Sequence, residues 1–335
     1  MDTTNLVAMI RYCRPAGSKF EHQFINNFLR PLGVEQDDKG NIYKRIGDLP
    51  VLWSSHTDTV HHKSGIQSVT VHDDWILLPK GSESNCLGAD DTAGVWIMSE
   101  MIKHNCPGLY VFHWGEERGG IGSKYISENP KILDGIQCAI AFDRKGFSDV
   151  ITHQFGRCCS DNFGDALALK LNKSGRDFKY KSCPHGVFTD TANYIEHIPE
   201  CTNLSVGYFE QHTANEYLDT IHLCDLRDVM CSTDFSDLPI IREKGESEYR
   251  HYSRYSQGGT WEQHNGYSLW KEDSLEDDYW KELEEESIRQ HYNGSQRPMH
   301  DLISDHPYEI ADLLESYGIT HEQLIYELRQ RGAIE

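Results

Sequence analysis

The sequence predicts an α/β protein in which an open sheet carries the functional residues at the ends of its strands. Short apolar runs of strand length start at Val51, Leu109, Cys138 and Asn203. A histidine or a carboxylate follows each run, and an apolar pattern with helical spacing separates the first two runs. Open α/β sheets place their sites at the carboxyl ends of the strands, so these side chains are expected to meet.

The residues that precede these runs predict two helices and a turn. Helical patterns cover about residues 5–14 and 19–32, and Gly33 follows the second pattern. Turn-forming residues at 37–41 then lead into a strand. This opening is compatible with many folds and assigns no functional residue by itself.

The first apolar run delivers a histidine to the end of a buried strand. Residues 51–56 are expected to form this strand, with His56 as its last residue. Asp58 lies two positions further on, where a carboxylate can orient the imidazole of a metal ligand. Taken alone, a His-x-Asp pattern is more often a strand-end histidine beside an exposed aspartate, so this interpretation depends on the other motifs.

Two adjacent aspartates mark the start of the next helix. Residues 87–94 contain Asp90 and Asp91, and apolar residues at helical spacing follow from Ala93 to Ile102. One aspartate is sufficient to cap a helix N-terminus. We therefore predict that Asp90 is a metal ligand shared between two ions.

Two adjacent glutamates follow the second apolar run, where a glycine-rich turn begins. Behind a buried strand, Glu116 and Glu117 would repel each other in a medium of low dielectric unless a cation or a shared proton compensates their charge. This pair predicts one metal ligand, Glu117, and one proton-transfer group, Glu116.

The last two runs complete the ligand set. Asp143 directly follows the run at 138–142, and His212 lies shortly beyond the run at 203–207. Imidazole and carboxylate are the ligands expected of zinc in a hydrolytic site, because structural zinc sites are mostly built from thiolates. The sequence therefore predicts two divalent metal ions, most simply zinc, with cobalt or manganese as alternatives. The predicted ligands are His56, Asp90, Glu117, Asp143 and His212.

These motifs resemble those of the co-catalytic di-zinc metallopeptidases of clan MH. This clan includes aminopeptidases, tripeptidase (peptidase T), glutamate carboxypeptidases, aminoacylases and succinyl-diaminopimelate desuccinylase. The resemblance covers about residues 1–225, and residues 88–94 are most similar to peptidase T. It implies a three-layer αβα sandwich with a mixed, largely parallel central sheet.

The resemblance also implies a role for each residue. Asp90 would bridge the two metals, while His56 and one of Glu117 or Asp143 would complete one site. His212 with the other carboxylate would complete the second site. Glu116 would be the general base, and Asp58 would orient His56.

The chain departs from the family pattern between Asp143 and His212. Members with a lid domain insert it there, with a size on the order of a hundred residues. This interval is too short to contain such a domain and still supply sheet strands. The chain is therefore expected to be a lidless form. A lid histidine often stabilises the oxyanion in this clan, and His185, His153 and Tyr208 are the candidates to replace it.

Three residues are candidates for binding the substrate: Asp190, Arg144 and His185. Asp190 is expected either to pair with a free α-amino group or to form a turn or N-cap. Arg144 is expected either to be solvated or to bind a substrate carboxylate. The predicted activity is cleavage of a peptide or amide bond by an aminopeptidase-type exopeptidase.

Two other activities of the clan stay open, together with one noncatalytic alternative. Arg144 and Arg157 would favour substrates with a free carboxylate, as for an N-acyl amino acid deacylase or a carboxypeptidase. The more distant alternative is a noncatalytic scaffold that binds a partner through the C-terminal appendage.

Composition excludes several other classes of protein. A formal net charge of −21 argues against binding nucleic acid through its phosphates. The sequence contains no apolar stretch long enough to cross a membrane and no basic start typical of a secretory signal, so a cytoplasmic location is expected. The 10 cysteines are expected to be reduced thiols in a chain that makes its own core. An oligomer is possible.

The sequence predicts three regions. Residues 1–240 are expected to form a di-metal catalytic domain without an inserted lid. Residues 241–290 are polar and acidic and predict a linker followed by a solvated helix. Residues 291–335 predict a small α-helical appendage, with helix starts at Asp305 and Thr320.

Overall fold

The computed structural model describes residues 3–154 and 156–245. These residues all belong to one compact unit. The acidic helix predicted within 241–290 and the appendage predicted at 291–335 lie outside the described residues. The predicted boundary at residue 240 therefore stays a prediction.

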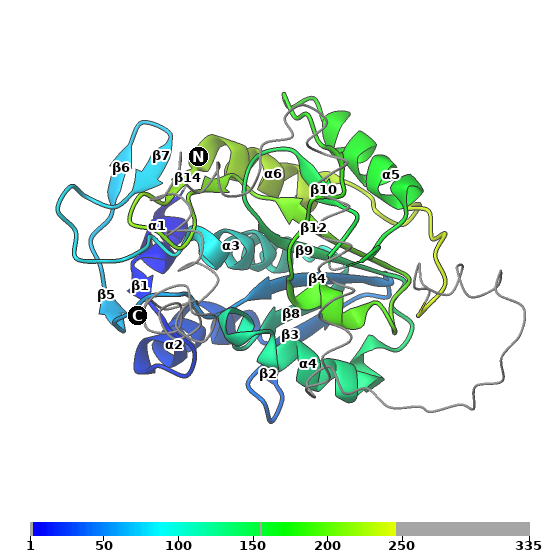
Figure 1. The fold of residues 1–335 in the computed structure, drawn as a ribbon, viewed down its shortest axis with the longest axis horizontal. Helices are drawn as coiled ribbons and strands as arrows, with labels where there is room; N and C mark the ends of the chain where they lie inside the picture. Colours follow the sequence, from blue (N-terminus) through cyan, green and yellow to red (C-terminus); the bar gives the residue numbers. More distant parts are fainter. Residues whose placement is uncertain (1–2, 155, 246–335) are drawn as a thin grey trace, which may run out of the picture. The chain divides into compact units, whose positions relative to one another are not determined.

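An eight-stranded mixed sheet forms the centre of the fold (Figure 1). Its four inner strands β12, β9, β4 and β8 all pair in parallel, whereas β10, β3 and β2 add antiparallel pairings at the two sides. In spatial order the strands are β11 (Lys181–Cys183), β10 (Asp149–Ile151), β12 (Glu200–Ser205), β9 (Cys138–Arg144), β4 (Val51–His56), β8 (Gly108–His113), β3 (Ile42–Ile46) and β2 (Glu35–Gln36). The prediction of a mixed, largely parallel sheet is confirmed.

The inner strands are buried along their length. Every residue of β4, β8 and β12 is buried, as expected for parallel strands covered on both faces. In β4, Ser54 Oγ lies 3.3 Å from Nδ1 of His113 on the neighbouring strand, whereas the buried hydroxyl of Ser55 has no hydrogen-bond partner among the residues that the structure describes.

Helices cover both faces of the sheet, which confirms the three-layer architecture. Figure 1 shows α3 and α6 on one side of the central strands and α4 on the other. The larger apolar core includes Trp96 of α3, Leu223 of α6 and Phe163 of α5. The smaller core on the opposite face includes Ile126 of α4 and Tyr194. The helices are α1 (Thr4–Ile10), α2 (Lys19–Phe24), α3 (Ala89–Lys103), α4 (Ile121–Glu128), α5 (Asp161–Asn172) and α6 (Thr220–Ser232), with short 3-10 helices at Glu116–Arg118, Pro130–Leu133 and Asp190–Tyr194.

A small antiparallel sheet lies beside α3 and was not expected from the sequence. Its strand order is β13 (Tyr208–Phe209), β14 (Tyr217–Asp219), β7 (Trp75–Leu77) and β6 (Thr70–His72). Ile76 and Leu218 face each other on its inner side and are fully buried in the larger core. A separate two-stranded pairing joins β1 (Tyr12–Cys13) to β5 (Gly65–Ile66).

The structure corrects the N-terminal prediction in one place. The helix expected at 5–14 ends at Ile10, and residues 12–13 form β1 instead. Backbone bonds to the 59–67 segment compete with the helix here, since Arg11 O accepts from Gln67 N and Arg14 O accepts from Thr59 N. The second helical run is present from Lys19 but changes from α to π and then to 3-10 geometry, and it ends at Leu32 before Gly33.

The predicted strands are present with shifted ends. The strand expected at 203–207 is β12, which covers Glu200–Ser205, and β9 extends past the expected run to include Asp143. All 10 cysteines are free thiols, as predicted. Among the described residues, no helix has both the length and the apolar character needed to cross a bilayer.

Candidate metal centre

The five predicted ligands lie close together at one edge of the central sheet. His56 ends β4, Asp143 lies near the end of the neighbouring strand β9, and Glu117 lies in the 3-10 helix that follows β8. Asp90 starts α3, and His212 lies in the loop between β13 and β14. Because parallel strands end at the same edge, residues far apart in the chain meet here.

Asp90 lies between two clusters of candidate ligands. Nε2 of His56 lies 3.0 Å from Oδ1 of Asp90 and 3.6 Å from Oδ1 of Asp143. On the other side, Nε2 of His212 lies 3.3 Å from Oδ2 of Asp90 and 3.0 Å from Oε1 of Glu117. In each set of three the ligand atoms lie within 4.8 Å of one another.

The closest contacts correspond to one of the two arrangements that the sequence left open. Asp143 lies with His56, and Glu117 lies with His212. Each oxygen of Asp90 faces a different histidine. A third set of the same kind joins His56 to Glu116 and Glu117, so Glu116 borders the same space.

The pKa values of the clustered residues indicate that a positive charge is needed to balance their carboxylates. Burial raises the pKa of Glu117 and of Asp143, and repulsion from Asp90 raises them further. Burial alone would lower the pKa of His212, but hydrogen bonds to Asp90 and Glu117 raise it to about 11. The cluster thus retains protons at positions where a cation would replace them, which fits a metal site made of imidazole and carboxylate donors.

Asp91 differs from Asp90 in its contacts, and a cis peptide bond joins the two residues. Its Oδ1 accepts a hydrogen bond from the backbone N–H of Gly94 at 2.9 Å, and its Oδ2 accepts one from the N–H of His56 at 3.1 Å. This agrees with the expectation that only one of the two aspartates caps the helix.

Asp58 connects the end of β4 to the turn that carries the glutamates. Nδ1 of His56 lies 3.1 Å from the carbonyl oxygen of Asp58 and 3.5 Å from its Oδ1. A proton on Nδ1 directed at Asp58 leaves the lone pair of Nε2 free for a metal. The Asp58 carboxylate also accepts the backbone N–H groups of Glu116 at 3.1 Å and Glu117 at 3.3 Å.

Glu116 lies at the same edge of the sheet with its carboxyl group in a buried setting. Burial raises its pKa well above the ordinary value, and the nearby carboxylates Asp143 and Asp190 add to this shift although His56 opposes it. A carboxylate whose pKa is raised in this way is suited to accept and return a proton near neutral pH.

Asp143 is held from several directions. Its backbone N–H donates to Oδ1 of Asn203 at 2.9 Å, and its carbonyl accepts from Nδ2 of the same residue at 2.8 Å. The hydroxyls of Thr189 and Tyr208 donate to its two carboxylate oxygens at 2.6 and 3.2 Å. These contacts hold the Asp143 carboxylate with its Oδ1 atom 3.6 Å from Nε2 of His56.

Glu216 is a functional residue that the sequence did not reveal. The residue is 1% exposed, and its carboxylate accepts the backbone N–H groups of Leu87 at 2.8 Å, Gly88 at 2.9 Å and Asp90 at 3.0 Å. Burial raises its pKa to about 7. Glu216 therefore fixes the loop that presents Asp90. The only sequence signal was a glutamate four residues after His212.

Arg14 is a second residue that the sequence did not reveal. It is fully buried; its Nε donates to the carbonyl of Thr57 at 2.6 Å and its Nη1 donates to the hydroxyl of Thr92 at 2.8 Å. Burial lowers its pKa to about 10, while Asp91, Glu21 and Asp58 favour its charged form. This cation ties the segment after His56 to the start of α3.

The residues suggested for substrate binding lie in more constrained places than the sequence indicated. Asp190 begins a 3-10 helix and is 1% exposed, with its Oδ2 3.2 Å from Nδ1 of His113. Burial raises its pKa to about 8. Arg144 pairs with Asp149 at 3.1 Å and donates to the carbonyl of His185 at 3.0 Å. A substrate carboxylate would have to compete with Asp149 for Arg144, and the substrate roles of these residues stay predictions.

Solved structures of other proteins share this fold. No model of a known protein family matches the sequence, and no curated protein matches it. The solved structure of the aminopeptidase PepT from Bacillus cereus is similar, with a TM-score of 0.54 and 17% identity over 68% of this chain and 96% of that one.

Two further solved structures share this likeness. A tripeptidase from Staphylococcus aureus has a TM-score of 0.53 and 15% identity, over 68% of this chain and 95% of that one. A TET aminopeptidase from a marine sediment thaumarchaeon has a TM-score of 0.51 and 11% identity over the same shares. At these identities the likeness shows a common α/β fold, as the sequence predicted.

Proposed function

We propose that this chain is a metal-dependent hydrolase that cleaves a peptide or amide bond, most simply an aminopeptidase-type exopeptidase. The observation that carries the proposal is that Asp90 is shared between two sets of ligands, His56 with Asp143 and His212 with Glu117. Solved structures with the same fold are an aminopeptidase and a tripeptidase, which supports the same chemistry.

The ligand set fits two divalent ions. A mixture of imidazole and carboxylate ligands favours zinc over softer ions, which prefer thiolates, and over harder ions, which prefer oxygen ligands alone. When bound, such a pair lowers the pKa of a water molecule and polarises the scissile carbonyl. His56, Asp90 and Asp143 would hold one ion, and Asp90, Glu117 and His212 would hold the other.

The chain's own residues would then move the proton and maintain the geometry. Glu116 would accept a proton from the attacking water on its carboxylate and return it to the leaving nitrogen. Asp58 would keep Nδ1 of His56 protonated and directed away from the metal. Glu216 would fix the backbone of Asp90 from behind.

The proposal favours an aminopeptidase over a deacylase or a carboxypeptidase. The alternatives depended on Arg144 and Arg157 as sites for a substrate carboxylate. Both already pair with an aspartate, Arg144 with Asp149 at 3.1 Å and Arg157 with Asp161 at 2.9 Å.

The test compares unblocked dipeptides with their N-acetylated forms and with N-acetyl amino acids, using protein loaded with zinc, cobalt or manganese. We expect hydrolysis of the unblocked dipeptides, with metal content measured on the same samples. Cleavage of acetylated substrates alone would instead favour the deacylase. A metal-loaded protein that cleaves none of them would contradict the proposal and leave the noncatalytic scaffold. Activity that survives Glu116→Gln would instead contradict the role of Glu116 as the proton acceptor.

A further inference from the structure

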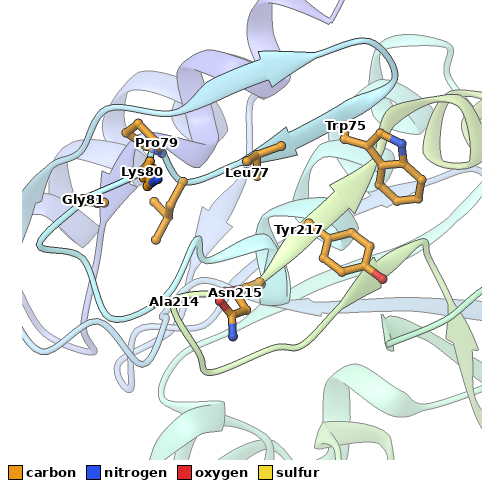
Figure 2. A pocket seen from close by; sticks show the side chains of 11 residues that line it. Trp75, Leu77, Pro79, Lys80, Gly81, Ala214, Asn215 and Tyr217 are labelled. Atoms are coloured by element: carbon orange, nitrogen blue, oxygen red, sulfur yellow. The ribbon is translucent and has the colours of Figure 1, made fainter.

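Two open cavities at the surface differ in the reactive groups that line them. The first, of about 460 Å³, lies beside β7 and the segment that leads into β14 (Figure 2), and among the described residues no cysteine or histidine lines it. The second, of about 760 Å³, lies where α3 and α6 end. Its lining includes Cys231, which is half-buried. The second cavity therefore gives a dissolved reagent access to a thiol.

A second cysteine contacts Cys231 from the interior of the fold. Cys106 follows α3, and its Sγ lies 3.7 Å from the carbonyl oxygen of Cys231, which belongs to the last turn of α6. The two thiol groups also form a hydrogen bond with each other. Cys106 is 8% exposed and does not line the cavity. The packing of α3 against α6 thus joins a buried thiol to an accessible one, although 125 positions separate them in the sequence.

This pair differs from the other cysteines in its acidity. The hydrogen bond with Cys231 lowers the pKa of Cys106 to about 7 against the effect of burial, and the nearby His104 contributes to the same shift. The same hydrogen bond raises the pKa of Cys231, so the pair loses one proton near neutral pH and retains the other. The thiolate is the nucleophile in thiol–disulfide exchange, and it is most effective when the pKa lies near the ambient pH.

The remaining thiols lack this combination of acidity and access. All 10 cysteines lie in the described part of the chain, and Cys106 is the only one of them whose pKa is lowered. Cys158, Cys159 and Cys201 also interact with one another, but they are fully buried, and burial raises the pKa of each. A dissolved oxidant therefore has one favoured target in this fold.

The lining of the second cavity suits a small, polar reagent that carries charges of both signs. The basic side chains of Lys103, His104 and Arg227 line it together with the carboxylates of Glu100 and Asp228. Its volume lies within the range of about 300–1,000 Å³ that is typical of small-ligand sites. A small peptide disulfide with ammonium and carboxylate groups fits both the size and the charges.

We propose that Cys106 and Cys231 form a reversible disulfide bond by exchange with a small-molecule disulfide that enters this cavity. Two cysteines can be bridged without backbone movement only when their sulfurs are already neighbours, as they are here. Cys106 follows the end of α3, whereas Asp90 starts this helix. The bond would therefore form away from the candidate metal ligands, whether or not the chain is a hydrolase.

The exchange takes place in two steps. In the first, the remaining proton of the pair moves to Cys106, and the thiolate of Cys231 attacks one sulfur of the small disulfide, whose S–S bond breaks to release a thiol. In the second, Cys106 loses its proton and attacks Sγ of Cys231, which forms the internal bond and releases the second thiol. The protein loses two electrons and two protons, and the small disulfide takes up both as it becomes two thiols.

The test exposes reduced, full-length protein to excess glutathione disulfide near neutral pH, followed by acid quenching, alkylation of the remaining thiols and digestion without reductant. We expect mass spectrometry to show a peptide in which Cys106 is joined to Cys231, and dithiothreitol should remove it. Cys183→Ser is the matched control, because Cys183 is also half-buried but lies on β11, and this variant should form the same peptide.

Single substitutions separate the two steps. Cys106→Ser should stop at the mixed disulfide, with glutathione attached to Cys231, whereas Cys231→Ser should leave Cys106 reduced. Circular dichroism checks that both variants are folded, and the wild-type peptide map tests the bond without any variant. Wild-type protein in which both thiols are still alkylated, or in which glutathione stays on Cys231 without a cross-link, would overturn the proposal.

Discussion

Oε1 of Glu216 accepts a hydrogen bond from the backbone N–H of Asp90 at 3.0 Å, although 126 positions separate the two residues in the sequence. The other oxygen of Glu216 accepts the N–H groups of Leu87 and Gly88. One buried carboxylate thus accepts hydrogen bonds from three backbone N–H groups at the start of α3. The position of the ligand shared by both candidate sites depends on this contact.

Glu216→Gln tests the contact directly. A glutamine places an NH₂ group where one carboxylate oxygen now accepts, so at least one buried donor loses its partner at a cost of about 1–3 kcal/mol. We expect a lower melting temperature and a lower metal content after dialysis. Glu210→Gln in the same loop is the control, because Glu210 is exposed. Equal metal retention in the two variants would show that Glu216 does not position Asp90.

The sequence predicted which candidate ligands lie at the ends of strands, because the strand signal is local. His56 and Glu117 follow apolar runs that form β4 and β8, and Asp90 stands at a helix start. The sequence could not show that Asp143 lies with His56, because that depends on the spatial order of β9, β4 and β8. Strand order is set by long-range packing and leaves no trace in the spacing of apolar residues.

The residues that support the site were missed for related reasons. Glu216 lies in a polar loop with no apolar period to indicate that it is buried. Arg14 lies where the sequence resembles the end of a helix, whereas β1 and its pairing with β5 bring it to the carbonyl of Thr57, next to His56. The strands β6, β7, β13 and β14 have two or three residues each, which is too short for an alternating pattern.

Glu116→Gln should remove the proton acceptor while retaining all five candidate ligands. A positioned general base is typically worth about 10²–10⁴ in rate, so we expect kcat to fall by that factor or more. Metal content, measured by mass spectrometry on the same preparation, should match the wild type. A variant that loses metal together with activity would show that Glu116 is a ligand, as its place in the third ligand set allows.

The two clusters predict different metal losses for different substitutions. His212 is 48% exposed and belongs to one cluster, so His212→Ala should lower occupancy at one site with little change in unfolding free energy. Asp90 belongs to both clusters, so Asp90→Ala should lower occupancy at both. Titration with cobalt, followed by its absorption spectrum, distinguishes the two outcomes, with exposed His72→Ala as the control. The same loss in both variants would contradict a shared ligand.

Arg14 should contribute to stability mainly through its buried charge. Arg14→Met removes the nearby cation that offsets the charges of Asp91 and Glu21, and it leaves the acceptors on Thr57 and Thr92 without their donor, at about 1–3 kcal/mol for each buried acceptor. Arg14→Lys keeps the charge but loses the bond to either Thr57 or Thr92, so its loss should be smaller. Urea unfolding of both variants checks this order, and Arg45→Met at an exposed position is the control. Equal losses of unfolding free energy in Arg14→Lys and Arg14→Met would show that the hydrogen-bond geometry of Arg14, and not its charge, stabilises the fold.

The lowered pKa of His222 predicts how the stability of the fold depends on pH at a position away from the candidate metal centre. Burial lowers its pKa to about 4, and its Nε2 lies 2.9 Å from the hydroxyl of Tyr180. The unfolded chain binds a proton at this histidine below about pH 6.5, whereas the folded protein does not until about pH 4. The stability linked to His222 is therefore complete above about pH 6.5 and is lost as the pH falls toward 4, by up to about 3 kcal/mol.

His222→Gln should flatten this part of the pH dependence. Tyr180 keeps its hydrogen bond to the carbonyl of Ser205 at 2.8 Å, so the variant loses the titrating group more than the packing. We expect the fall in unfolding free energy between about pH 7 and pH 4 to be smaller in His222→Gln than in the wild type, by up to about 3 kcal/mol. His72→Gln, at an exposed site, should leave the wild-type slope unchanged. Urea unfolding across this range measures the difference, and parallel curves for His222→Gln and wild type would mean that His222 is protonated equally in the folded and unfolded states.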